Sequence, residues 1–156
     1  MTTDNTPRRT IANDIFFASV EELLKEGRSV EMLLPGGSFS MRPFLRSGKD
    51  EIRLSSAEGV ELRKGMVVLF RYGGRHILHR YRGTSPEGRL RMEGDGNYRL
   101  TEWVDRGDVV ALLTEVRRGR REFSYGSMGW RVRSCWSLLV KRLRTIAIDL
   151  KHKFIK

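Results

Sequence analysis

Apolar residues recur with helical spacing near both ends of the chain and gather in short runs between them. Near the start, this spacing predicts a helix over Thr10–Glu26, with Gly27 as its natural end. Near the end, apolar positions at i, i+3, i+4 and i+7 predict a second helix over Ser134–Ile155. The apolar residues of this second helix are Trp136, Leu139, Val140, Leu143, Ile146, Ala147, Leu150 and Phe154. Basic residues lie mainly on its other side, so we expect a basic amphipathic helix.

Between these helices the chain contains β-branched and aromatic runs separated by glycine turns. The strongest strand prediction is Met66–Tyr72, because Gly65 precedes it and Gly73 and Gly74 follow it. The run Arg75–Arg82 is expected to pair with it as a hairpin. Further strands are predicted at Ser29–Leu34, Glu51–Leu54, Leu90–Glu93 and Val109–Val116. The pattern therefore predicts a mainly antiparallel β fold with a helix at each end. We divide it into an N-terminal helix (1–27), a core (28–116) and a basic C-terminal extension (117–156).

The net charge of +11 is unevenly placed along the chain. Arg117–Lys156 holds 12 Lys and Arg against 2 acidic residues, whereas the preceding residues hold 18 against 17. Such asymmetry indicates an anionic partner for the C-terminal segment, either lipid headgroups or nucleic acid. The alternative is that the apolar side of the last helix packs on the body while its basic side is solvated.

The cysteine content and the hydrophobic runs restrict cofactors and location. Cys135 is the single cysteine, so the sequence offers no Cys pair for a disulfide or a zinc site, and we expect neither a metal nor another cofactor. No stretch reaches the roughly 18 apolar residues that span a bilayer, and the first residues lack the apolar run of a signal peptide. We therefore expect a cytoplasmic location, with the inner membrane face as the place where the basic segment would bind.

The segment Gly37–Pro43 has the features that a serine nucleophile needs. Such a serine requires an exposed hydroxyl on a sharply turned backbone, with donors nearby for the oxyanion. Ser38 and Ser40 are two residues apart, so in an extended segment both hydroxyls face the same side. One can attack while the other, with the Ser40 N–H, stabilises the developing negative charge. Alone, the same segment also fits a Gly/Ser-rich loop without chemistry.

A base and a carboxylate are available elsewhere in the core. His79 lies on a predicted strand, and an imidazole with its ordinary pKa near ~6.5 can accept a serine proton at physiological pH. His76 faces the opposite side of that strand, and His152 lies in the basic segment. A carboxylate that accepts the second imidazole N–H would complete a triad, and Asp95 in a glycine turn is our candidate. The competing carboxylates are Glu93, Glu102 and Asp105.

Taken together and in this order, these segments resemble signal peptidase I and its relatives, including the LexA-type self-cleaving repressors. That group carries Ser-x-Ser-Met-x-Pro, then Gly-Asp-x-Val-x-Phe, then a Lys-Arg or His-Arg pair, and last a Gly-Asp-Asn turn. The corresponding segments here are Ser38–Pro43, Gly65–Phe70, His79-Arg80 and Gly94–Asn97. Two positions depart from the pattern, because Met66 stands where Asp is usual and Gly96 stands in the place of Asn.

The resemblance implies Ser40 as the nucleophile, Ser38 as an oxyanion donor and Asp95 as the residue that orients the histidine. His79 corresponds to the general base of endoplasmic-reticulum-type signal peptidases, where histidine replaces the lysine of other members. The sequence also departs from the group: it contains no membrane-spanning anchor, and it has neither the Ala-Gly nor the Cys-Gly bond at which LexA-type proteins cleave themselves.

These observations predict a serine endopeptidase that cleaves peptide or precursor-protein substrates through an acyl-enzyme. Phe39 and Met41 are expected to form an apolar wall beside the substrate, and the resemblance implies small side chains next to the cleaved bond. The C-terminal helix is expected to bind an anionic membrane surface, and nucleic acid is not an expected partner of the peptidase. The alternative function is a catalytically inactive, peptidase-like module that binds nucleic acid or a protein through its basic segment.

Overall fold

The computed structural model describes residues 17–154. Residues 17–25 are helical, and the part of the predicted first helix before residue 17 lies outside the described residues. The remaining elements are β1 (Val30–Leu33), β2 (Glu51–Ser56), β3 (Val67–Tyr72), β4 (Arg75–Thr84), β5 (Leu90–Glu93), β6 (Glu102–Val104), the 3-10 helix η1 (Arg106–Asp108), β7 (Val109–Arg118), β8 (Arg121–Ser124) and α2 (Met128–Phe154).

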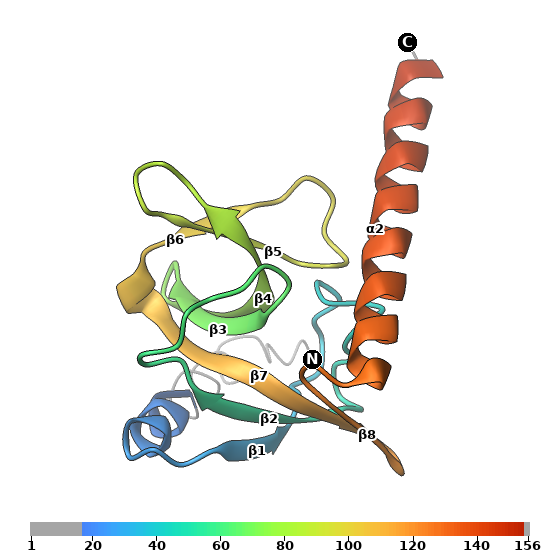
Figure 1. Ribbon diagram of the computed structural model, residues 1–156. Helices are drawn as coiled ribbons and strands as arrows, with labels where there is room; N and C mark the ends of the chain where they lie inside the picture. The colour runs from blue at the N-terminus through green and yellow to red at the C-terminus, as the bar shows by residue number, and fades with distance from the viewer. Residues whose placement is uncertain (1–16, 155–156) are drawn as a thin grey trace, which may run out of the picture.

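Within the described residues, eight strands form one sheet in the order β1-β2-β7-β3-β4-β5-β6, with β8 paired to β7 (Figure 1). All of these pairings are antiparallel. The sheet curls strongly, and the register shifts at Arg53/Leu54, Leu69/Phe70 and Tyr81/Gly83 mark irregularities of the bulge type that bend strands. The expected fold class, mainly antiparallel β with a helix near each end, is confirmed.

The core occupies both faces of the curled sheet, and β3 shows why. Successive residues of a strand point to opposite faces. Val67 and Leu69 therefore join one apolar cluster, with Phe44 and Trp130, while Val68 and Phe70 join a second cluster. A continuous apolar run such as β3 is thus buried on both sides, which makes it a rigid support for its hairpin partner β4.

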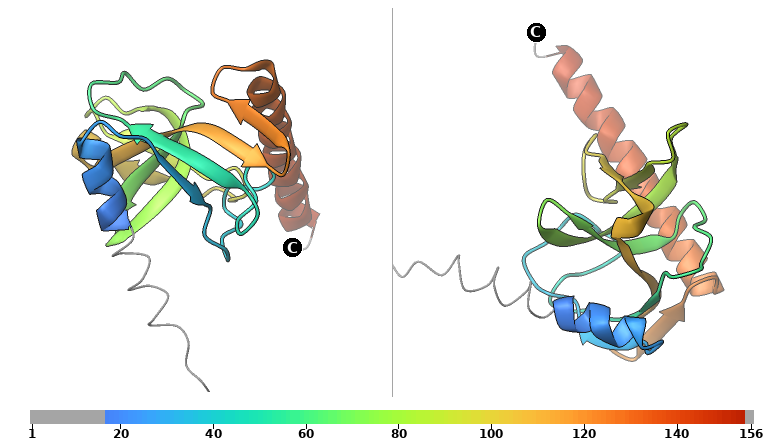
Figure 2. Two further views of the ribbon diagram at one scale, coloured as in Figure 1. Left: turned by 90° about the horizontal axis from the view of Figure 1, so that it is seen from below. Right: turned by 90° about the vertical axis from the view of Figure 1, so that its left-hand side faces the viewer.

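The C-terminal helix α2 begins at Met128, six positions before the expected start at Ser134. The Ser127 hydroxyl accepts a hydrogen bond from the Trp130 N–H at 3.2 Å, which is the arrangement of a helix N-cap. Trp130 is buried against Phe44 and fixes the first turn to the body. From there α2 runs beside the sheet, and its C-terminal end extends beyond the body (Figures 1 and 2).

Three further findings bear on the sequence expectations. The short strands β6 and β8 were not predicted. The apolar side of α2 does not pack on the body, since Trp136 is 61% exposed and Leu143 is 58% exposed. Across residues 17–154, no helix combines the length and the apolar character needed to cross a membrane.

Candidate active site

The segments singled out in the sequence meet in one cleft of about 500 Å³. Ser38 and Ser40 come from the loop after β1, His79 from β4, Asn97 from the turn after β5, and Glu102 from β6. The other lining residues are largely apolar and include Leu34, Met41, Leu69, Leu78 and Leu100. An apolar cleft with a few converging polar groups is the usual form of a binding or catalytic site.

The two serine hydroxyls lie side by side, as the spacing predicted. The chain turns sharply at Gly36 and Gly37, and Gly37 has a positive φ of 92° that favours glycine. Ser38 Oγ and Ser40 Oγ are then 3.2 Å apart, within hydrogen-bond distance. The chain turns again from residue 40 to residue 44, where Phe44 is fully buried and anchors the loop in the core.

The two expected wall residues behave differently. Met41 is buried and lines the cleft. Phe39 is 63% exposed, does not line the cleft, and packs instead under the guanidinium of Arg42 at 4.4 Å. Because Ser38 and Ser40 face the cleft, the residue between them faces away, so the expectation for Phe39 is corrected.

His79 is oriented by Glu102. Nδ1 of His79 lies 2.9 Å from Oε2 of Glu102, and both side chains are buried. A carboxylate accepts, so Nδ1 carries the hydrogen and Nε2 is left as the basic nitrogen. Nε2 faces the serine loop: a Cβ placed at Gly94 would lie 2.9 Å from it and 2.5 Å from the Ser40 carbonyl oxygen, so one carbon atom would touch both.

The turn Gly94–Asn97 fixes the serine loop in this position. The Gly96 N–H donates to the Ser40 carbonyl oxygen at 2.7 Å. A Cβ at Gly96 would lie 2.3 Å from the carbonyl oxygen of Phe39, a distance that no side chain tolerates. Both glycines therefore allow the backbone of this turn to approach the backbone of the serine loop closely. This close approach accounts for the glycine at position 96.

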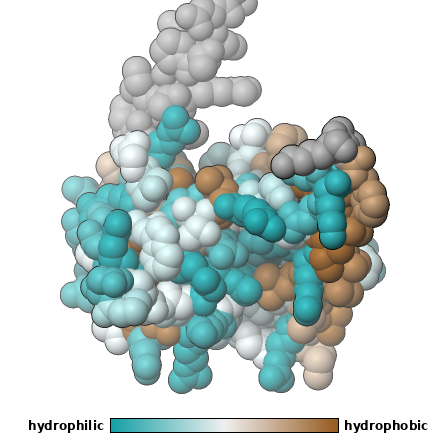
Figure 3. All heavy atoms as spheres, turned by 90° about the horizontal axis from the view of Figure 1, so that it is seen from above, coloured by the Kyte–Doolittle hydropathy of each residue, from teal (hydrophilic) through white to brown (hydrophobic). Residues whose placement is uncertain are grey.

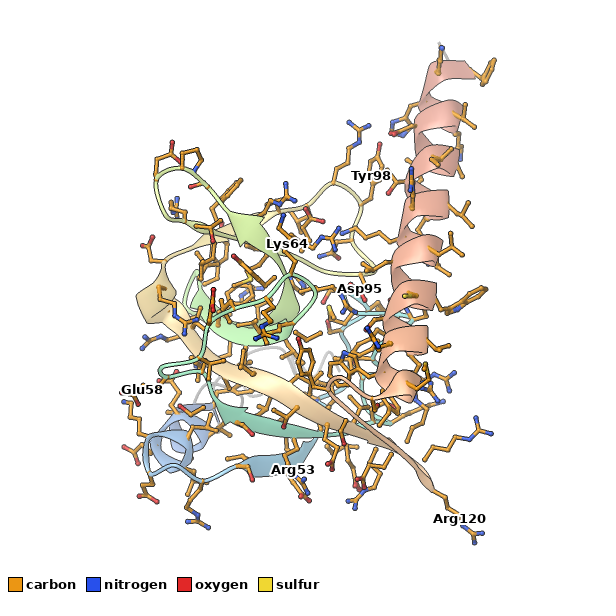
Figure 4. The ribbon with its side chains drawn as sticks, in the orientation of Figure 1. Arg53, Glu58, Lys64, Asp95, Tyr98 and Arg120 are labelled. Carbon is orange, nitrogen blue, oxygen red and sulfur yellow. The ribbon has the colours of Figure 1, made fainter. Side chains whose placement is uncertain are left out.

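Asp95 does not contact the histidine, and its expected role is corrected. Its two carboxylate oxygens accept from Nε and an Nη of Arg80 at 2.8 and 2.6 Å, and both side chains are almost completely buried. Ser137 of α2 donates to the same carboxylate at 2.7 Å. A buried carboxylate requires a charged or hydrogen-bonding partner, and Arg80 supplies it. Asp95 is thus a structural link between β4 and α2, and it lies between the sheet and that helix (Figure 4).

Helix α2 contacts the turn Gly94–Asn97 and the residues on either side of it. Lys141 donates to the Gly94 carbonyl oxygen and pairs with Glu93. Farther along, Asp149 accepts from Tyr98, which points toward α2 in Figure 4, and from an Nη of Arg99. The hydrogen bond from Tyr98 and then that from Arg99 hold the pKa of the Asp149 carboxyl below its ordinary value. The bond to Asp149 likewise raises the pKa of Tyr98.

His76, the alternative base, is occupied elsewhere. It touches the cleft, but its Nε2 binds Oε1 of Glu21 at 2.6 Å and its ring stacks on Phe17.

Within residues 17–154, no three His, Cys, Asp or Glu side chains gather in a way that could hold a metal ion. Comparisons of the chain with family models and with curated protein sequences found no match.

Proposed function

We propose that the chain is a serine endopeptidase of the signal-peptidase/LexA-like type, in its histidine-base variant. The observation that carries this proposal is the buried bond between Glu102 and His79, which leaves the histidine Nε2 facing the Ser40 loop in an apolar cleft. A histidine held by a carboxylate in the same cleft as a serine hydroxyl is the arrangement by which serine hydroxyls are activated. In the proposal, Glu102 takes the orienting role that the resemblance implied for Asp95.

The first half of the reaction forms an acyl-enzyme. Ser40 Oγ attacks the carbonyl carbon of a peptide bond while its proton passes to Nε2 of His79. The negative charge on the substrate oxygen is stabilised by the Ser38 hydroxyl and the Ser40 N–H. Glu102 stabilises the doubly protonated imidazole. When the C–N bond breaks, His79 gives the proton to the leaving amine.

The second half releases the product. Water, deprotonated by the now neutral His79, attacks the ester carbonyl of acylated Ser40. The carbon–Oγ bond breaks, the proton returns to Ser40, and a carboxylic acid leaves. Leu34, Met41 and Leu69 line the cleft, which supports an apolar substrate segment. The sequence resemblance points to small side chains beside the cleaved bond.

The proposal is tested by reacting the protein with a serine-directed acylating reagent and locating the adduct by peptide mass spectrometry. We expect a single adduct on Ser40, lost in Ser40→Ala. Ser47 lines the same cleft, so Ser47→Ala is the matched control and should react like the unchanged protein. A binding module without chemistry would give no adduct, or equal slow labelling of both serines, and either result would refute the proposal.

A further inference from the structure

The outer side of α2 carries an uninterrupted apolar stripe that no other described residue covers. Its members are Met128, Val132, Trp136, Leu139, Leu143, Ile146, Leu150 and Phe154, each between 47% and 80% exposed. They recur every three or four residues, so they lie on one face along the whole helix. Figure 3 shows apolar residues gathered along the side of the molecule that α2 forms. Contiguous apolar surface of this kind marks an interaction site.

Basic residues border this stripe on both edges. At about 100° per residue, Arg131, Arg142 and Lys153 fall along one edge, and Arg144 and Lys151 along the other. All five side chains are exposed. The single acidic residue of α2 is Asp149, and its carboxylate is bound to Tyr98 and Arg99. The exposed side of the helix is therefore apolar in the middle, and the charged side chains at its margins are cationic except Asp149, whose carboxylate is bound to Tyr98 and Arg99.

We propose that this face of α2 docks the protein on an anionic membrane surface, with the helix lying in the plane of the lipid headgroups. The apolar residues then enter the boundary between the headgroups and the acyl chains. Arginine and lysine side chains on both edges reach the lipid phosphate groups. Trp136 in the first half of α2 suits the interface, where an aromatic ring with one polar atom is favoured. The proposal is independent of the chemistry at Ser40.

A second copy of the chain fits this face less well. The spacing from Val132 to Leu150 would suit a two-helix seam. However, two copies would bring together margins that carry the same positive charge, and like charges facing each other oppose pairing. Trp136 is also bulky for a seam position. The charge pattern therefore favours an anionic partner over another α2.

Docking leaves the site intact, because the opposite side of α2 holds the body. Ser137 binds Asp95, and Lys141 binds Glu93 and the Gly94 carbonyl oxygen. Removal of the helix would therefore disturb the turn Gly94–Asn97, so it would not test lipid binding separately from folding. Substitutions on the outer side touch none of these bonds, so they separate lipid binding from folding.

The test measures co-sedimentation of full-length Ser40→Ala protein with vesicles of phosphatidylglycerol and phosphatidylcholine. We expect Leu139→Glu/Leu143→Glu to weaken binding at least tenfold, with circular dichroism unchanged. Leu33→Glu, which alters an exposed apolar residue of β1, is the matched control and should bind like the parent. Arg131→Gln/Arg142→Gln/Lys153→Gln should weaken binding severalfold and reduce its salt dependence.

Tryptophan fluorescence gives a second readout. The emission should shift to shorter wavelength when vesicles are added, and Trp136→Phe should remove that shift. Equal binding to phosphatidylcholine alone, or undiminished binding by the Leu139→Glu/Leu143→Glu protein, would overturn the proposal. So would a dimer in solution that this double variant dissociates and that the three glutamine substitutions strengthen, since a second copy would then occupy the face.

Discussion

His79 and Glu102 form a buried pair in which Nδ1 of the imidazole lies 2.9 Å from Oε2 of the carboxylate. The two residues come from strands that are not neighbours, since β5 lies between β4 and β6. The two side chains therefore meet across β5. The consequence of the pair is a fixed tautomer, with the basic nitrogen directed at the serine loop.

Glu102→Gln should slow acylation of Ser40 by on the order of 10²-fold or more, because an amide N–H at this position favours the wrong imidazole tautomer. The rate of adduct formation measures the effect. Asp105→Asn, which alters an exposed carboxylate just after β6, is the matched control and should leave the rate unchanged. An undiminished rate in the Glu102 variant would remove this residue from the mechanism.

Asp95→Asn should act mainly on stability. It leaves the buried Arg80 guanidinium without its charged partner, and breaking such a pair typically costs about 3–5 kcal/mol. Urea unfolding measures the loss. Asp108→Asn breaks an exposed pair with Arg71 and should cost less than about 1 kcal/mol. A similarly small cost for the Asp95 variant would contradict its role as the link between β4 and α2.

Gly96→Ala should displace the serine loop, because the new Cβ would overlap the Phe39 carbonyl oxygen. A shift of about 1 Å in a reacting group costs roughly 10²-fold in rate, so Ser40 labelling should fall by about that factor. At Gly107 an added Cβ meets nothing within 4 Å. Gly107→Ala should therefore label normally, and equal rates for both variants would mean that the turn does not position Ser40.

The contact of α2 with Tyr98 and Arg99 should weaken in acid. The pKa of Asp149 is lowered in the folded chain, so its ionised form adds stability above the ordinary carboxyl range. That contribution is present above the ordinary carboxyl pKa of about 4, and it is lost as the pH falls from there toward the lowered pKa of the folded chain. The protection of amides in the last turns of α2, measured by hydrogen exchange relative to the intrinsic rate at the same pH, should then fall. Asp149→Ala should exchange fast already at neutral pH, and an exchange profile equal to that of the unchanged protein would contradict this account.

The strand pattern was largely predictable because it is local. β3, β4 and β5 follow from β-branched runs between glycines, and the alternation of Ser38 and Ser40 correctly placed both hydroxyls on one side. The start of α2 was missed because arginines interrupt its first turns, although Ser127 offered a capping signal. Burial of an apolar helix face depends on what lies opposite, so the exposure of Trp136 could not be read from spacing.

The choice of carboxylate could not be made from the sequence because it depends on tertiary contacts. Asp95 looked suitable as a turn residue, yet a buried arginine lies closer to it than the imidazole does. Glu102 left one signal: β6 alternates buried, exposed and buried residues, so a glutamate stands at an inward position together with Val104. A charged residue on the inner face of a strand requires a polar partner, and that partner is His79.

The most direct measurement of the central claim is the rate of Ser40 acylation in two histidine variants, followed by intact-protein mass spectrometry. His79→Ala removes the base and should slow the reaction by about 10²- to 10⁴-fold. His76→Ala removes a histidine of the same strand that is bound to Glu21, and this variant should react at nearly the rate of the unchanged protein, because His76 takes no part in the proton transfer. Acylation of the His79→Ala protein at the unchanged rate would contradict the account, because Ser40 would then be activated by a different group or not at all.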